Sequence, residues 1–112
     1  MVMPITRDLI DTALQAGYQV LAVEHPRSTR WLLTVRDSLG TSIMLVIQAR
    51  SLIGAADVQD LDELVRVRQL QRGMFWAYGG TFSSAAQRTC AELGAMRLLL
   101  CSSLPPASRI ER

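Results

Sequence analysis

The sequence predicts an α/β protein, a three-layer α/β/α sandwich around a mixed sheet of about five strands. Residues 41–50 are the most apolar run in the chain and are rich in β-branched residues. Their apolar residues occupy both odd and even positions, which is typical of a central strand covered on both faces. Residues 74–78 show the same pattern. Because an amphipathic helical pattern separates the two runs, we expect them to be parallel neighbours joined by a right-handed crossover.

The first half of the chain predicts a helix and a three-stranded meander. Gly17 supplies the helix stop. The dipeptide His25-Pro26 predicts a break after the first strand, because the residue before proline is biased towards extended or turn geometry. Residues 37–40 predict the turn of a hairpin. In chain order, the elements predicted for the whole sequence are a helix at 5–16, strands at 18–24, 31–36 and 41–50, a helix at 56–71, a strand at 74–78, a helix capped by Thr81 or Ser83 that ends at about 93, and a strand at 96–101.

The composition is that of one globular domain. A chain of 112 residues with 49% hydrophobic residues can build one core. We expect a domain at 1–101 and a loose tail at 102–112. No apolar run approaches the roughly 18 residues of a membrane helix, and the N-terminus lacks the pattern of a secretory signal. Cys90 and Cys101 lie in apolar sequence, which predicts reduced core thiols and a cytoplasmic location.

The charge gives little information about partners. A formal net charge of +2 is too small to predict nucleic-acid binding. All 12 basic residues are arginine, so no mechanism can use lysine. The surplus of arginine over acidic residues lies in the last third of the chain.

Polar residues are expected to meet at one end of the sheet. Gln48 and Arg50 are two positions apart at the end of the central strand, so they point to the same side. In an antiparallel meander, the end of the first strand, the start of the second and the end of the third share one edge. That edge should gather Glu24, His25, Arg27, Arg30, Gln48 and Arg50. One carboxylate, one imidazole and three guanidiniums suit a phosphate better than a cation.

The motif Gln48-Ala49-Arg50 is similar to a Gln-x-Lys at the end of a third strand, and Ile53-Gly54 to a Val-Gly loop before a helix. Residues 79–86 keep a Phe-Ser-x-x-Ala pattern. In this order, these features resemble the Mrr-type restriction endonuclease domain of the restriction-endonuclease-like PD-(D/E)xK fold. The resemblance covers residues 5–101, and it implies a role in DNA processing or defence.

The chain departs from that family at the positions that would hold metal. The resemblance implies Mg²⁺ between an acid at the start of the second strand and an oxygen ligand near the end of the third, with a lysine two residues later. Here the second strand starts with Arg30-Trp31, and Arg50 replaces the lysine. We therefore expect a catalytically degenerate domain without metal or cofactor. It would bind DNA phosphates weakly through Arg27, Arg30, Gln48 and Arg50, or act as a partner subunit.

Two alternatives stay open. One is an active metal-dependent nuclease with a rearranged site, using Glu24 or His25 and a displaced acid such as Asp11 or Asp57. The other is a protein-interaction module without nucleic-acid binding, which the modest charge favours. We also expect a homodimer in contact through residues 74–78 or the final strand, because two-face-apolar strands leave more apolar surface than a monomer usually hides. A larger protein partner is a further expectation.

Overall fold

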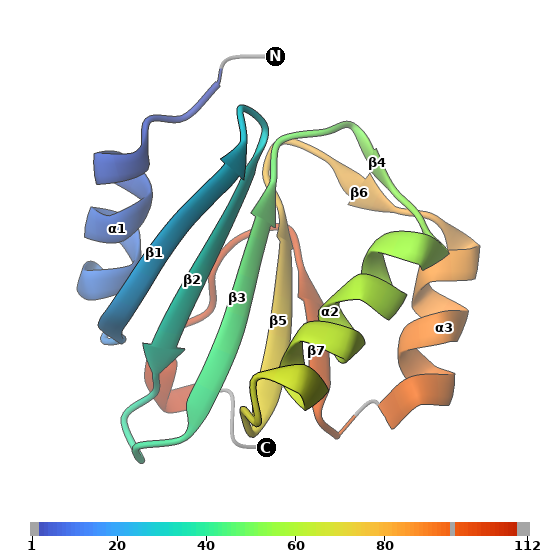
Figure 1. The fold of residues 1–112 in the computed structure, drawn as a ribbon. Helices are drawn as coiled ribbons and strands as arrows, with labels where there is room; N and C mark the ends of the chain where they lie inside the picture. Colours follow the sequence, from blue (N-terminus) through green and yellow to red (C-terminus); the bar gives the residue numbers. More distant parts are fainter. Residues whose placement is uncertain (1–2, 95, 110–112) are drawn as a thin grey trace.

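The computed structural model describes residues 3–94 and 96–109, which form a three-layer α/β/α sandwich (Figure 1). The elements are α1 (Thr6–Gln15), β1 (Gln19–Arg27), β2 (Arg30–Arg36), β3 (Ser42–Gln48), β4 (Leu52–Ile53), α2 (Ala55–Val67), β5 (Arg72–Ala77), β6 (Thr81–Phe82), α3 (Ser84–Gly94), β7 (Leu98–Cys101) and the 3₁₀ helix η1 (Ala107–Arg109). The main sheet has five strands in the order β1-β2-β3-β5-β7. β1, β2 and β3 are antiparallel neighbours, whereas β3, β5 and β7 are parallel. The predicted mixed sheet is confirmed.

Two apolar clusters lie on opposite faces of this sheet. α1 contributes Leu9 and Ala13 to one cluster, and α2 and α3 contribute residues such as Leu61 and Ala86 to the other. β3 supplies side chains to both: Ile43, Leu45 and Ile47 to the α1 cluster, and Met44 and Val46 to the α2 cluster. This division explains why its sequence is apolar at odd and even positions.

β1 continues through His25-Pro26 as far as Arg27, so the predicted break at the proline is wrong. β1 is an edge strand paired only with β2, and its register shifts between Glu24 and Arg27. An irregularity on an edge strand is a place where a proline, which has no N–H to donate, is tolerated. The β1–β2 hairpin is therefore longer than predicted and turns at residues 28–29.

The two crossovers after β3 and β5 also differ from expectation. α2 ends at Val67 rather than at 71, and Gln69, with a φ of 56°, takes a left-handed conformation just beyond its end. The two-residue strands β4 and β6 form a small parallel pair of their own. This pair ties the segment that follows β3 to the segment that follows β5.

The segment after β7 packs against the body of the protein. The hydroxyl of Tyr18 donates to the carbonyl of Pro105 at 2.8 Å, and the N–H of Ala107 donates to the carbonyl of Ala16 at 2.8 Å. Ala107 itself is buried. The expectation of a loose tail is therefore wrong for residues 102–108.

β5 is an interior strand, flanked by β3 and β7. Its residues from Gly73 to Ala77 are buried, so the dimer contact predicted at 74–78 cannot form there. β7 is the outer strand on this side of the sheet.

Within residues 3–94 and 96–109, no helix is both long and apolar enough to cross a bilayer. Cys90 and Cys101 are free thiols, and burial raises the pKa of Cys101 to about 12.

Candidate functional site

The candidate site lies where the β1–β2 hairpin turns and β3 ends. Arg30, the first residue of β2, is the cross-strand partner of both Arg27 in β1 and Gln48 in β3. Leu32 and Val46 lie two positions along the same strands and belong to the cluster beneath α2. Because residues two apart share a face, Arg30 and Gln48 lie on the face that α2 covers.

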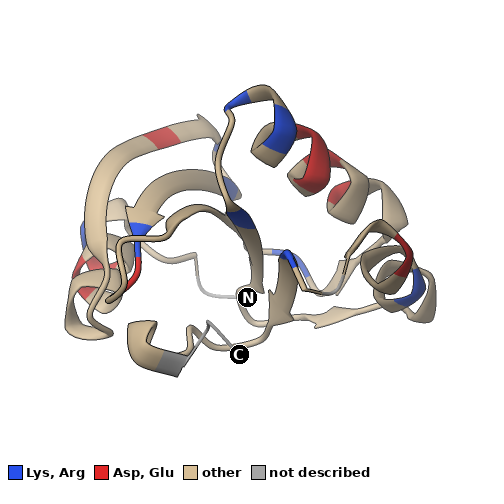
Figure 2. Ribbon diagram, turned by 90° about the horizontal axis from the view of Figure 1, so that it is seen from below, with Lys and Arg blue, Asp and Glu red and all other residues tan. Residues whose placement is uncertain are grey.

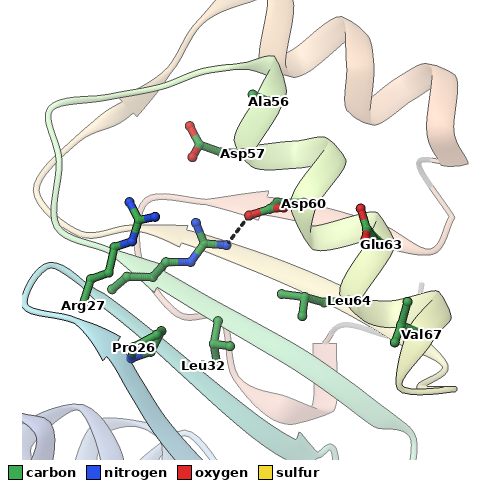
Figure 3. A pocket seen from close by; sticks show the side chains of 10 residues that line it. Pro26, Arg27, Leu32, Ala56, Asp57, Asp60, Glu63, Leu64 and Val67 are labelled. Atoms are coloured by element: carbon green, nitrogen blue, oxygen red, sulfur yellow. Dashed lines mark hydrogen bonds and ion pairs between the residues drawn. The ribbon is translucent and has the colours of Figure 1, made fainter.

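A groove of about 500 Å³ separates the hairpin from α2. Figure 3 shows Arg27 reaching into it from the hairpin, with Asp57 and Asp60 projecting from α2. The dashed line marks the ion pair in which Nη2 of Arg30 donates to Oδ2 of Asp60 at 3.0 Å. The Arg30 side chain is 14% exposed and that of Asp60 is 57% exposed. The groove is lined by Pro26, Arg27, Arg30, Leu32, Ala56, Asp57, Asp60, Glu63, Leu64 and Val67.

Arg50 is held at the start of α2. Its Nη2 is ion-paired with Oδ2 of Asp57, and its Nε donates to the carbonyl of Leu52 at 3.1 Å. The same Asp57 oxygen accepts the N–H of Gly54 at 3.0 Å. A carboxylate in the first turn also interacts favourably with the helix dipole. Asp57 therefore stabilises the beginning of α2 and fixes the position of Arg50.

Gln48 is buried at the inner end of the site. Its Nε2 donates to Oγ1 of Thr29 at 3.1 Å, and its carbonyl accepts the N–H of Tyr78 at 2.9 Å. The side chain thus joins β3 to the hairpin turn, and the backbone joins β3 to the end of β5.

Glu24 lies on the same side of the sheet but pairs with the far end of α2. Nη2 of Arg68 donates to its Oε1 at 3.0 Å, and Nη1 of Arg68 contacts Oε2. The hydrogen bonds from Arg68 lower the pKa of Glu24, and the charge of that guanidinium adds to the effect while partial burial opposes it. Glu24 is therefore an ion-pair partner and not a free carboxylate beside Gln48.

His25 was expected among these groups, but its ring lies on the opposite face of the sheet. Its ring stacks on Trp31, with ring centroids 4.4 Å apart and planes at 13°. Nε1 of Trp31 donates to Oγ1 of Thr6 in α1 at 2.9 Å. Side chains alternate along a strand, so Glu24 and His25 point to opposite faces, and His25 lies on the α1 side.

The residues present do not fit the Mg²⁺ site that the family resemblance implies. An arginine stands at the start of β2, and Asp57 and Asp60, two of the carboxylates that line the groove, are each bound by a different arginine. Among the residues that the structure describes, no group of three or more His, Cys, Asp or Glu side chains is placed to hold a metal ion.

Charge along the groove is mixed, which corrects the expectation of a predominantly basic edge. Two arginines and three acidic residues line it. In Figure 2, α2 carries acidic turns followed by basic residues at its C-terminal end, and the arginines are spread over several elements. Of the three arginines predicted to bind phosphate, only Arg27 has no carboxylate partner within the described part of the chain.

Sequence reasoning missed the contributions of Asp60, Glu63 and Arg68. In the sequence, the acidic residues of this helix have the pattern of a solvated helix face. Their spacing at 57, 60 and 63 places them along one side of the helix. Their partners lie far away in the sequence, however, since Arg30 precedes Asp60 by 30 residues. No local pattern reports such a pair.

Several solved endonuclease structures share this fold. The apo form of EndoMS matches with a TM-score of 0.65 and 20% identity, over 95% of this chain and 48% of that one. A complex of EndoMS with dsDNA matches with a TM-score of 0.64 and 23% identity, over 89% of this chain and 43% of that one. A repair endonuclease from Pyrococcus abyssi matches with a TM-score of 0.60 and 16% identity, over 89% and 45%.

These similarities confirm the predicted fold class, an α/β fold with a mixed sheet, which the chain shares with those solved endonucleases. The chain spans about half the length of the solved proteins that it matches. No protein-family model matches the sequence, and no curated protein does either.

Proposed function

We propose that this chain is a nuclease-fold domain that binds DNA weakly beside α2 and does not cleave it. The observation that carries the proposal is the pair of arginines at the motif positions. Arg30 begins β2 and Arg50 follows Gln48 by two residues, and each is neutralised by a carboxylate of α2. A guanidinium at these places brings the positive charge that a metal would bring, but it cannot accept a proton from water.

The similar structures support a role in DNA processing. They are described as EndoMS, in one case with dsDNA, and as a repair endonuclease. The likeness of Gln48-Ala49-Arg50 to the Mrr-type motif supports a restriction or defence setting as the finer proposal. Phosphates would be bound at Arg27 and Arg30, and Gln48 and Arg50 would contribute from the end of β3.

The test of lost catalysis is a nicking assay on supercoiled plasmid with Mg²⁺ or Mn²⁺. We expect no cleavage by the wild-type protein. Arg50→Lys should gain none, because it restores the lysine of the family but supplies no acid at the start of β2. Metal-dependent nicking by the wild type that disappears in Glu24→Gln or Asp57→Asn would instead establish the rearranged nuclease. Asp11 lies on α1, which packs on the opposite face from the groove, and Asp11→Asn serves as the control.

The test of DNA binding is fluorescence anisotropy with duplexes of unrelated sequence. Non-specific affinity of this kind is about 10⁻⁴ to 10⁻⁶ M at physiological salt. The double variant Arg27→Ala/Arg30→Ala should weaken binding equally for all sequences and reduce the salt slope, because phosphate contacts carry little sequence information. Arg88→Ala, a single exposed change on α3, is the control for loss of one positive charge elsewhere on the protein. If the wild type does not bind DNA, the chain is better described as a protein-interaction module. If the wild type, the double variant and the control bind DNA alike, the DNA is bound elsewhere than at this groove.

The proposal includes a homodimer in the cytoplasm, working with a larger protein partner. β7 supports the dimer, since it ends the sheet and carries the exposed Leu99 near the exposed Met96. The two free thiols support a reducing compartment. A monomeric mass by light scattering at tens of micromolar protein would contradict the dimer.

A further inference from the structure

The two carboxylates of α2 that meet the site arginines are held in different ways. Asp57 is only 16% exposed, and one of its oxygens serves both Arg50 and the N–H of Gly54. Asp60 is 57% exposed and bonds only to Arg30 among the described residues. Releasing Asp57 would remove a hydrogen bond from the start of α2, whereas releasing Asp60 breaks a single contact at the groove surface. Asp60 is thus the exchangeable member of the two.

The guanidinium of Arg30 requires a negative counter-charge, either from Asp60 or from a bound anion. Its side chain is 14% exposed, and a largely buried guanidinium without a counter-charge is costly. Arg27 is its direct cross-strand partner, and like charges directly opposite each other destabilise a sheet. Among the described residues only Arg30 of the two has a carboxylate partner, so Arg27 and Arg30 together carry one positive charge more than Asp60 neutralises.

The groove can admit a second anion at that point. Arg27 and Arg30 line it together, and its volume of about 500 Å³ exceeds the space that one phosphate group needs. Two guanidiniums present several N–H donors in planar forks that match the oxygens of a phosphate. Glu63 also lines the groove and, together with Asp60, disfavours anions further along α2.

We propose that Asp60 is a built-in competitor for DNA, occupying on Arg30 the position of a backbone phosphate. This inference rests on the proposed function, because it assigns the mode of DNA binding at the same groove. In the free protein Arg30 is paired with Asp60. When DNA binds, a phosphate oxygen replaces the carboxylate on Arg30 and is also contacted by Arg27, and Asp60 turns into solvent. The affinity for DNA is thus set lower than the arginines alone would give.

The experiment compares two variants with the same change in charge. Asp60→Asn removes the competing charge, and Asp11→Asn removes an identical charge from the exposed surface of α1, on the far face of the sheet. Affinity for a duplex oligonucleotide is measured by anisotropy at several salt concentrations. We expect Asp60→Asn to tighten DNA binding about three- to tenfold, because it removes a negative charge next to the bound phosphate. Asp11→Asn should change the affinity less than about twofold, because the charge that it removes is distant and screened.

A cycle with Arg30 separates exchange from general electrostatics. In an Arg30→Ala background, Asp60→Asn should lose its advantage over Asp11→Asn, since there is no guanidinium left to release. Asp60→Ala provides a second variant, and circular dichroism checks that each protein is folded. If the wild type binds DNA but Asp60→Asn and Asp11→Asn behave alike, the competitor role is overturned and the proposed function stands. If neither the wild type nor any variant binds DNA, both are overturned.

Discussion

Gly80 lies directly against the backbone of Arg50. A Cβ added at Gly80 would overlap the carbonyl oxygen of Arg50 and would lie 2.9 Å from that of Ser51. The N–H of Thr81 donates to the Ser51 carbonyl at 3.0 Å. The turn after β5 therefore supports the residues that follow β3, and the position of Arg50 depends on the absence of a side chain at residue 80.

Gly80→Ala is expected to destabilise the protein by about 1–3 kcal/mol, because the obstacle is backbone and cannot rotate away. The measurement is the free energy of unfolding in urea. Gly54→Ala is the comparison, since a Cβ there meets nothing within 4 Å. As Gly54 precedes the first turn of α2, its replacement should cost less than about 1 kcal/mol. Equal effects of the two substitutions would contradict the close packing at Gly80.

Asp62 joins α2 to the start of β7. Its carboxylate accepts a hydrogen bond from Nη2 of Arg97 at 2.6 Å and another from Nε of Arg66 at 3.1 Å. The Asp62 side chain is only 8% exposed. Asp62→Ala should destabilise the protein by about 1–3 kcal/mol, because both arginines lose their partner. Arg66 is 64% exposed, so Arg66→Ala should cost no more than about 0.5 kcal/mol. The free energies of unfolding of the two variants are measured in urea. A larger loss of stability in Arg66→Ala than in Asp62→Ala would contradict the prediction.

The docked segment after β7 should contribute to stability. Ala107→Asp would bury a carboxylate without a partner among the described residues and should destabilise the protein by at least about 2 kcal/mol. Ser108 is exposed, so Ser108→Asp should stay within about 0.5 kcal/mol of the wild type in thermal and urea unfolding. Similar stability for both variants would mean that the segment is not held against the protein in solution.

The pair between Glu24 and Arg68 predicts a pH dependence. The pKa of Glu24 is lowered in the folded state from its ordinary value of 4.5, chiefly by hydrogen bonds from Arg68. A lowered carboxyl pKa stabilises the folded state above the ordinary value, and this contribution is lost as the pH falls through the folded-state pKa. Because both side chains are substantially exposed, we expect it to be below about 1 kcal/mol.

A carboxyl titration by NMR tests this prediction directly. The pKa of Glu24 should lie below 4.5 in the wild type and return towards that value in Arg68→Ala. The stability difference between wild type and Glu24→Gln should be constant at neutral pH and shrink in acid. A pKa of Glu24 that does not respond to Arg68→Ala would rule out the pair as its cause.

The fold could be predicted because its main signals are local. The two-face-apolar pattern of β3 identified a central strand, and the helix that follows it predicted the parallel pairing with β5. The position of Gln48 beside Arg30 followed from antiparallel register alone. Pro26 misled the prediction, because its cost depends on whether a strand lies at the edge, and the sequence does not show the strand order.

The ion pairs of the site could not be predicted in the same way. Glu24 and Arg68 are 44 residues apart, and their contact depends on how α2 crosses the sheet. An acidic helix face is usually solvated, so the composition of α2 gave no reason to place Asp60 on Arg30. The exposure of each carboxylate, which separates Asp57 from Asp60 in role, is a property of packing and has no sequence pattern.

The strand order also affects the order in which the elements that line the groove fold. β1, β2 and β3 are joined by short turns and can pair from neighbouring positions in the chain. The pairing of β3 with β5 requires closure of the whole intervening segment, which carries a larger entropic cost and is slower. Arg27 and Arg30 belong to the meander, while Asp57 and Asp60 arrive only with the crossover. A folding intermediate that contained the meander alone would expose both arginines to nucleic acid before Asp60 was in place on Arg30.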